Sequence, residues 1–161
     1  MLILTALTCG IGGFITETIQ YSIKEGHFVK RGFTFGPWGP IYVCGGLIIL
    51  LFTYQYKKYP MRVLIINSLT LGTLEGLTGW VLDKFFHKRL WDYSKSLLNI
   101  NGYVCLHSVL LFGIGSLIVI YLLIPQIVKL QRKTNTKTFT IISIGLFTLF
   151  IIDVIFYALI H

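Results

Sequence analysis

Charged residues are scarce in this chain, at 12% of 161 residues, whereas hydrophobic residues make up 55%. Soluble domains contain about 25% charged residues. A soluble fold of this size could not bury so much apolar surface, and the mean hydropathy of +0.77 points the same way. The shortage of charge therefore excludes an ordinary soluble domain and predicts a protein that crosses the membrane several times.

The motifs of several enzyme and cofactor classes are also missing. The three cysteines, Cys9, Cys44 and Cys105, lie in apolar runs without CxxC or Cys/His spacing, so neither a disulfide framework nor a zinc site is indicated. There is no phosphate-binding glycine loop, no HExxH and no serine elbow. We expect no cofactor and no metal. No polar stretch is long enough to form an ATPase, so any use of ATP would require a separate chain.

Basic residues outnumber acidic ones, with 14 Lys and Arg against 6 Asp and Glu, which gives a net charge of +8. They fall between the apolar runs, which indicates contact with anionic lipid headgroups and not with nucleic acid. They divide equally between the two sides of the predicted bundle. The positive-inside rule therefore leaves the orientation open, with a slight preference for cytoplasmic links after the first and third helices.

Five apolar runs predict an all-α polytopic membrane bundle, arranged as one transmembrane domain over residues 1–161. The first run lacks a basic segment and a cleavage site, so we expect a retained helix and not a signal peptide. Pro125 is expected to end the fourth helix. The predicted helices cover residues 2–23, 40–56, 63–86, 102–124 and 139–160.

Two of the predicted hairpins look like copies of each other. Residues 13–17 (GFITE) match residues 79–83 (GWVLD), and residues 42–44 (YVC) match residues 103–105 (YVC). The copies extend over about residues 2–56 and 63–124, and the final helix, about 139–160, stands apart. Parallel repeats of this kind are common in transporters. Chance similarity within a low-diversity membrane sequence is the alternative.

Each copy contains a basic and aromatic link, RGFTFGPWGPIY in the first and RLWDYSKSLLNINGY in the second. Aromatic residues with Arg and Lys are typical of the headgroup boundary. Gly36 and Pro37 prevent a regular helix in the first link. These links are expected either to lie in the interface or to re-enter the bundle, where irregular backbone is tolerated only if protein or water covers it.

Ionisable residues inside apolar helices are costly and point to a site. Counting along the helices places Glu17, Glu75, Asp83, His107 and Asp153 at the centre or in one half of the membrane. Glu75 lies nearest the centre and borders a face formed by Gly72, Gly76 and Gly79, so we expect it to point into the bundle. It would either contact a solute or proton, or hold helices together. For Asp153 the structural role is favoured, and His107 would pair with Glu75 or Glu17, or serve packing.

Further candidates lie in the links. Trp38, Trp91 and Asp92 are expected at the mouth of a site that both copies face. Asn101 is a further candidate for binding the substrate, although its position first indicates a turn before the fourth helix. Two basic pairs would bind phosphate or a lipid headgroup, unless they only set topology. The pairs are Lys30 with Arg31, and Lys88 with Arg89.

The motifs RGFTFGPWGPIY, LEGLTGW, LWDYS and NINGYVCL together resemble a family of small bacterial integral membrane proteins described as putative ABC-transporter type IV. The likeness covers roughly residues 10–125 and the FIID motif at 150–153. Phe14 stands where the family usually has Trp, Gly39 where Cys is common, and His107 where Arg is common. The resemblance implies a multi-pass protein of the bacterial cytoplasmic membrane that works as a homo-oligomer or with other membrane subunits, including a separate ATPase.

The leading hypothesis is a membrane component of a transport system for a small or amphiphilic solute, with Glu17 and Glu75 in a polar site. A second is an enzyme or binder acting on a lipid or isoprenoid headgroup, with Glu75 and His107 as acid and base. A third is an accessory or assembly protein without a site. All three stay open at this point, although the missing nucleophile and metal motifs disfavour the enzyme.

Overall fold

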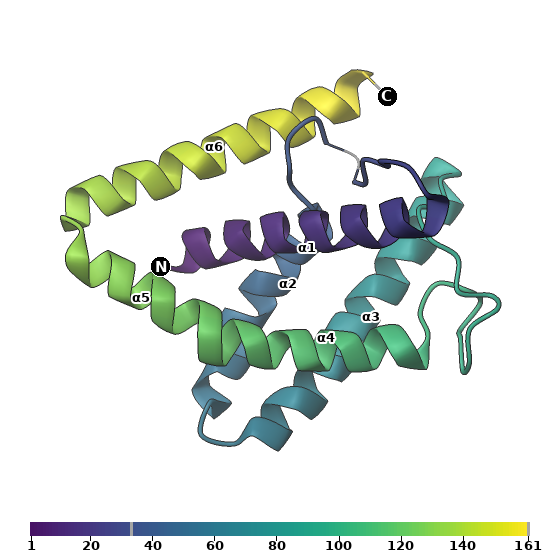
Figure 1. Ribbon diagram of the computed structural model, residues 1–161, viewed down its shortest axis with the longest axis horizontal. Coiled ribbons are helices and arrows are strands. Elements are labelled where there is room, and N and C mark those ends of the chain that lie inside the picture. Colours follow the sequence, from purple (N-terminus) through teal and green to yellow (C-terminus); the bar gives the residue numbers. More distant parts are fainter. Residues whose placement is uncertain (33, 161) are drawn as a thin grey trace. The chain divides into compact units, whose positions relative to one another are not determined.

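The computed structural model describes residues 1–32 and 34–160, and these residues form five helices and no strand when consecutive helical segments are joined (Figure 1). The all-α prediction is confirmed. Two of the five helices contain π turns. The helices are α1 (Leu2–Glu25), α2 (Pro40–Ile48) continued by a π turn (Ile49–Thr53) and a 3-10 turn (Tyr54–Tyr56), α3 (Pro60–Phe86), α4 (Leu106–Ile118) continued by a π turn (Val119–Leu123) and α5 (Ile124–Lys133), and α6 (Thr136–Ile160).

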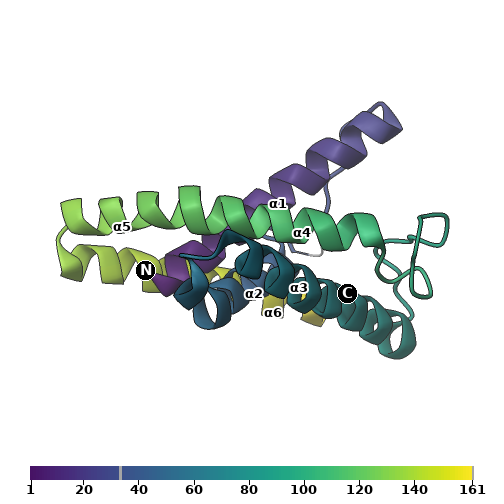
Figure 2. The ribbon, with the colours of Figure 1, turned by 90° about the horizontal axis from the view of Figure 1, so that it is seen from below.

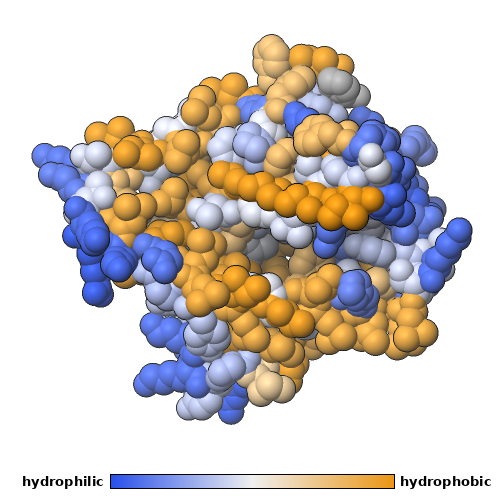
Figure 3. Space-filling view, in the orientation of Figure 1, coloured by the Kyte–Doolittle hydropathy of each residue, from blue (hydrophilic) through white to orange (hydrophobic). Residues whose placement is uncertain are grey.

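Three of the helices are long and apolar enough to cross a membrane, namely Leu2–Glu25, Leu106–Lys133 and Thr136–Ile160. The helix Pro40–Tyr56 is apolar but shorter. Helix α3 has 27 residues, but Asn67, Ser68 and Glu75 make it less apolar. Figure 3 shows apolar side chains over the visible part of α6 and hydrophilic ones at its junction with α5. These features indicate a membrane protein.

The fourth helix differs from its prediction at both ends. Pro125 does not end it, because the π turn Val119–Leu123 comes just before the proline and the helix runs on to Lys133. A proline ring clashes with the carbonyl group four residues earlier in a regular helix, and a wider π turn relieves that clash. The predicted end of the fourth helix at residue 124 is therefore wrong, and only residues 134 and 135 separate α5 from α6.

The helix begins at Leu106 and not at residue 102. Asn101 and Gly102 have positive φ angles of 51° and 75°, and Cys105 is extended at φ −142° and ψ 165°. The Ser108 hydroxyl accepts a hydrogen bond from the Cys105 N–H group and so caps the first turn. The link before α4 consequently has a folded structure of its own.

The chain divides into two compact units, and each is described by itself. The first unit consists of Met1–Leu47 and Leu123–His161, and its core contains Ala6, Leu7, Val43 and Phe150. The second unit is Ile48–Leu122.

In the second unit α3 and α4 lie side by side (Figures 1 and 2). A Cβ atom at Gly72 would lie 2.7 Å from a methyl group of Val109, and one at Gly113 would collide with the Ser68 hydroxyl. The small residues therefore bring the two backbones close together. On the glycine face of α3, Gly72 meets helix α4, whereas Gly76 and Gly79 meet residues of the link before α4.

Candidate functional site

Glu75 is a buried carboxylate in the middle of α3, with 4% of its surface exposed. Its Oε1 atom accepts a 3.0 Å hydrogen bond from the Tyr93 hydroxyl, and Oε2 accepts a 2.6 Å hydrogen bond from the Ser108 hydroxyl. Burying a carboxylate costs several kcal/mol unless donors replace the lost water. Three segments of the second unit, α3, the link and α4, thus meet at this one carboxylate.

Ser108 connects Glu75 to the beginning of α4. Its hydroxyl oxygen lies 3.2 Å from the Cys105 nitrogen that donates to it, and 2.9 Å from the Cys105 carbonyl oxygen. The Ser108 hydroxyl has a single proton to donate. Of its two possible acceptors, the Glu75 carboxylate is closer than the Cys105 carbonyl oxygen. The same side chain therefore caps the helix and stabilises the carboxylate.

The link between α3 and α4 is folded onto α3. Trp91 lies over Gly79, where an added Cβ atom would be 3.3 Å from the indole ring. The indole N–H donates a 2.8 Å hydrogen bond to the Tyr103 carbonyl group. The Tyr103 hydroxyl in turn donates a 2.6 Å hydrogen bond to Asp83 on α3. These contacts hold the link in the position from which Tyr93 reaches Glu75.

Arg89, Asp92 and Asn101 come together at the outer turn of the link. The Arg89 guanidinium lies 3.1 Å from the Asp92 carboxylate and donates a 2.8 Å hydrogen bond to the Asn101 carbonyl group. The Ser94 N–H group also donates to Asp92, and this bond, helped by Arg89, holds the pKa of the carboxyl group below its ordinary value. Glycine is favoured at position 102, because its φ of 75° is a conformation that residues with a side chain rarely adopt. In this arrangement the three residues stabilise the turn.

The first unit contains a second carboxylate with a tyrosine partner. Glu17 on α1 accepts a 2.7 Å hydrogen bond from the Tyr42 hydroxyl at the start of α2, and its other oxygen lies 3.9 Å from Nε of Arg31. The Arg31 guanidinium also stacks 3.8 Å from the centre of the Tyr21 ring. Glu17 is less enclosed than Glu75, with 28% of its side chain exposed.

The first link is held by α6. Asp153 accepts hydrogen bonds of 3.0 Å and 2.8 Å from the N–H groups of Phe35 and Gly36. Trp38 packs edge-on against Phe150, with 6.0 Å between the ring centres. Lys30 donates to the Phe35 carbonyl group. Asp153 therefore has the structural role that the sequence favoured, although its partner is link backbone and not another helix.

The predicted site residues are divided between the units. Glu17, Lys30, Arg31 and Trp38 lie in the first unit, and Glu75, Lys88, Arg89, Trp91, Asp92, Asn101 and His107 lie in the second. His107 is exposed on α4 and has no hydrogen bond or ion pair with any residue that the structure describes. Lys88 is exposed in the link.

Four hydroxyl groups that bind the carboxylates were not predicted from the sequence. They are Tyr42, Tyr93, Tyr103 and Ser108. Tyr42 and Tyr103 belong to the YVC motifs that match between the two copies, and Tyr93 lies within the WDYS motif. Ser108 has no comparable sequence signal apart from its position three residues after Cys105.

A protein-family model described as putative ABC-transporter type IV matches residues 4–158 of the chain. The match therefore extends over nearly the whole sequence and includes all five helices. No curated protein and no solved structure matches the chain.

Proposed function

Because the chain belongs to the putative ABC-transporter type IV family, we propose that it is a multi-pass component of a transport system for a small or amphiphilic solute in the bacterial cytoplasmic membrane. The proposal is supported by the family match over residues 4–158 and by three helices that are long and apolar enough to cross a membrane. The sequence has no ATP-binding motif, so a separate ATPase chain and other membrane subunits would complete the system.

The single observation that best supports a polar site is the environment of Glu75. This carboxylate is 4% exposed and takes hydrogen bonds from the link and from α4. A membrane protein that needed only helix packing would avoid such a group, because a charge within the bilayer costs a few kcal/mol. We infer that Glu75 contacts the solute.

The chemistry of Glu75 limits the solute. An ionised carboxylate only accepts hydrogen bonds, so its ligand must present donors such as an amine, a hydroxyl or an amide. Tyr93 is the exchangeable partner in this proposal, because it belongs to the link and forms a 3.0 Å hydrogen bond to Oε1. A solute donor that displaces the Tyr93 hydroxyl satisfies the same carboxylate oxygen.

Some of the other predicted members of the site belong to the second unit, and the rest belong to the first unit. Trp91 and Asp92 lie in the link that carries Tyr93, and Asn101 closes its outer turn. They are proposed as the mouth of the site. Glu17, Trp38 and His107 stay predicted contacts, as do Lys30, Arg31, Lys88 and Arg89 for phosphate or lipid headgroups.

We also infer that the two hairpins are repeats, since matched residues make matched contacts. Tyr42 donates 2.7 Å to Glu17, and Tyr103 donates 2.6 Å to Asp83. Added Cβ atoms at Gly13 and Gly79 would meet the same two tyrosines. Double-mutant cycles on the Tyr42–Glu17 and Tyr103–Asp83 pairs should give coupling energies of similar size. Coupling in one pair alone would contradict the repeat.

When the two copies are aligned, Glu75 and Ser108 fall opposite residues of a different chemical kind in the first copy. The spacing that pairs Gly13 with Gly79 puts Cys9 opposite Glu75, and the spacing that pairs Tyr42 with Tyr103 puts Leu47 opposite Ser108. An apolar pair thus occupies these positions in the first copy. Two hairpins of the same architecture do not need a carboxylate there, which supports a functional role for Glu75.

Transport by membrane vesicles tests the proposal. Vesicles containing wild-type protein and its cellular partners should accumulate at least one amine or polyol from a radiolabelled panel when ATP is supplied. Glu75→Gln should reduce the initial rate about tenfold or more at equal protein level, because the amide no longer provides a second full acceptor oxygen. Glu25→Gln makes the same change at an exposed position and should not. Equal rates for both variants would refute the role of Glu75.

A further inference from the structure

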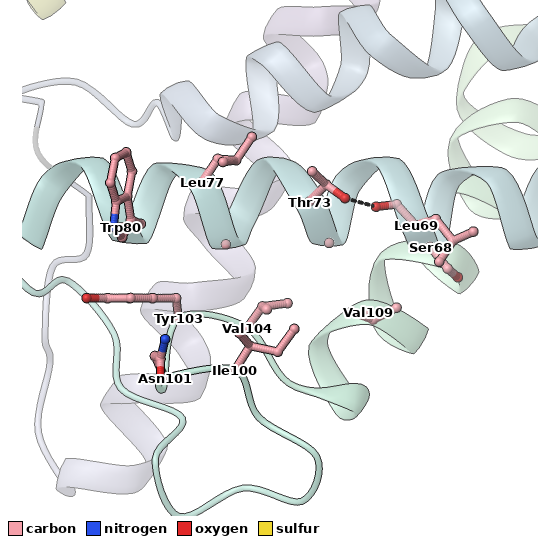
Figure 4. A pocket seen from close by; sticks show the side chains of 12 residues that line it. Ser68, Leu69, Thr73, Leu77, Trp80, Ile100, Asn101, Tyr103, Val104 and Val109 are labelled. Carbon is pink, nitrogen blue, oxygen red and sulfur yellow. Dashed lines mark hydrogen bonds between the residues drawn. The ribbon is translucent and has the colours of Figure 1, made fainter.

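A groove runs along the face of α3 in the second unit, with a volume of about 440 Å³. Figure 4 shows Trp80, Leu77, Thr73 and Leu69 in order along α3, with the segment from Ile100 to Val104 across from them. Small-molecule sites in proteins usually measure about 300–1,000 Å³. The groove is therefore large enough for part of a lipid.

Glycines of α3 form the floor of the groove, where the side chains of Val109 and Val104 pack close to the helix. Gly72 and Gly76 both line it, and a Cβ atom at Gly76 would lie 3.3 Å from Val104. The rim is apolar and open, since Leu69 is 65% exposed, Leu77 57% and Ile100 66%. In a membrane, an open groove with such a lining meets acyl chains and not water.

Charged residues lie at one end of the groove, namely the bases Lys84 and Arg89 and, bonded to the groove-lining Tyr103, the carboxylate of Asp83. Arg89 lies beside it, 2.8 Å from the Asn101 carbonyl group and 5.4 Å from the centre of the Tyr103 ring, and both of these residues line the groove. Lys84 follows Trp80 by one helical turn and is exposed. Trp is typical of the headgroup boundary, so the Trp80 end belongs near the headgroups and the Leu69 end lies deeper.

We propose that this groove binds an anionic glycerophospholipid. One acyl chain lies along Leu77, Thr73 and Leu69, and the phosphate is attracted by Lys84 and Arg89. Arg89 is partly neutralised by Asp92 at 3.1 Å, so Lys84 provides most of the selectivity for an anionic headgroup. The occupant is a lipid of the surrounding membrane. Glu75 does not line the groove, although Asn101, at the proposed mouth of the Glu75 site, does.

Lipid retention measured by native mass spectrometry tests the proposal. The protein is purified from nanodiscs that contain equal amounts of phosphatidylglycerol and phosphatidylcholine with identical acyl chains. Wild-type protein should retain phosphatidylglycerol in several-fold excess. Thr73→Phe fills the groove and should reduce the retention of both lipids about tenfold. Thr70→Phe is its control, because Thr70 is exposed on the same helix, bonds its own helix backbone as Thr73 does, and does not line the groove.

The role of the Lys84 charge in selecting an anionic headgroup is tested by a separate substitution. Lys84→Gln should remove the excess of phosphatidylglycerol and leave phosphatidylcholine retention unchanged. Lys58→Gln is the control, an exposed lysine near the opposite end of α3. Equal retention of the two lipids by wild-type protein, or the same loss in Lys58→Gln as in Lys84→Gln, would overturn the headgroup assignment. Equal retention by Thr73→Phe and Thr70→Phe would overturn the groove as the acyl-chain site.

Discussion

The Ser108 hydroxyl donates a 2.6 Å hydrogen bond to Oε2 of Glu75 and so joins the first turn of α4 to the middle of α3. Ser108→Ala should reduce the free energy of unfolding in mixed micelles by about 1–3 kcal/mol, because it leaves a buried carboxylate oxygen without this donor. Ser116→Ala is the matched control. Ser116 is also buried on α4, but among the described residues its hydroxyl bonds only its own helix backbone at Gly113. Equal small losses in both variants would contradict a special role for the Ser108 contact.

Tyr93→Phe should have opposite effects on stability and on solute affinity. The variant loses the hydrogen bond to Oε1 of Glu75, which should cost about 1 kcal/mol of stability. A solute no longer has to displace the tyrosine hydroxyl, so its affinity should rise. Tyr121→Phe loses a hydrogen bond to the Lys57 carbonyl group in the same unit and should leave affinity unchanged. Weaker binding by Tyr93→Phe would show that Tyr93 is not an exchangeable partner.

A substitution at Asn67 is predicted to stabilise the folded protein. Its side chain is fully buried on α3, and neither amide atom forms a hydrogen bond with any described residue. Replacing an unsatisfied buried amide with an apolar group of similar size removes its desolvation cost. Asn67→Leu should therefore raise the unfolding free energy by about 1–2 kcal/mol. A loss of that size, measured by the same unfolding titration, would mean that the amide has a partner in the membrane.

The link between α3 and α4 should become less stable at low pH, because the Asp92 carboxylate is then protonated. Its pKa lies below the ordinary 3.8, so the folded form stabilises the carboxylate. This contribution is present above the unfolded-state pKa and is lost as the pH falls through the lower folded-state pKa. Hydrogen exchange at the Ser94 amide, corrected for intrinsic rates, should become faster below about pH 4 in wild-type protein. Asp92→Asn should lack this transition, and an unchanged transition in the variant would assign it to another group.

The sequence predicted the helices from the length of its apolar runs, and the orientation of Glu75 from helical spacing. The glycine spacing on α3 predicted that Glu75 points inward, and its 4% exposure agrees. The end of the fourth helix was not predictable, because the π turn Val119–Leu123 lets the chain continue past Pro125. Sequence rules describe how proline disrupts a regular helix and contain no signal for a turn that accommodates it.

The partners of Glu75 depend on how the link folds, which local patterns do not describe. Leu98 and Asn101 have positive φ angles of 50° and 51°, and such angles are uncommon for residues other than glycine. They shape the link that brings Tyr93 to α3. His107 was a candidate partner, but successive residues on a helix point about 100° apart, so Ser108 reaches Glu75 while its neighbour is exposed.

The central claim is that Glu75 binds a solute that donates hydrogen bonds, and fluorescence of Trp91 tests it most directly. The chain has three tryptophans, so Trp38→Phe with Trp80→Phe leaves Trp91 as the reporter beside α3. This protein in nanodiscs is titrated with ethanolamine, putrescine, glycerol and sorbitol, and with acetate and succinate as acids that lack the required donors. We predict a saturable response to at least one amine or polyol, weakened about tenfold or more by Glu75→Gln and unchanged by Glu25→Gln. No response to any donor-bearing probe, or equal affinity in the two variants, would contradict the account.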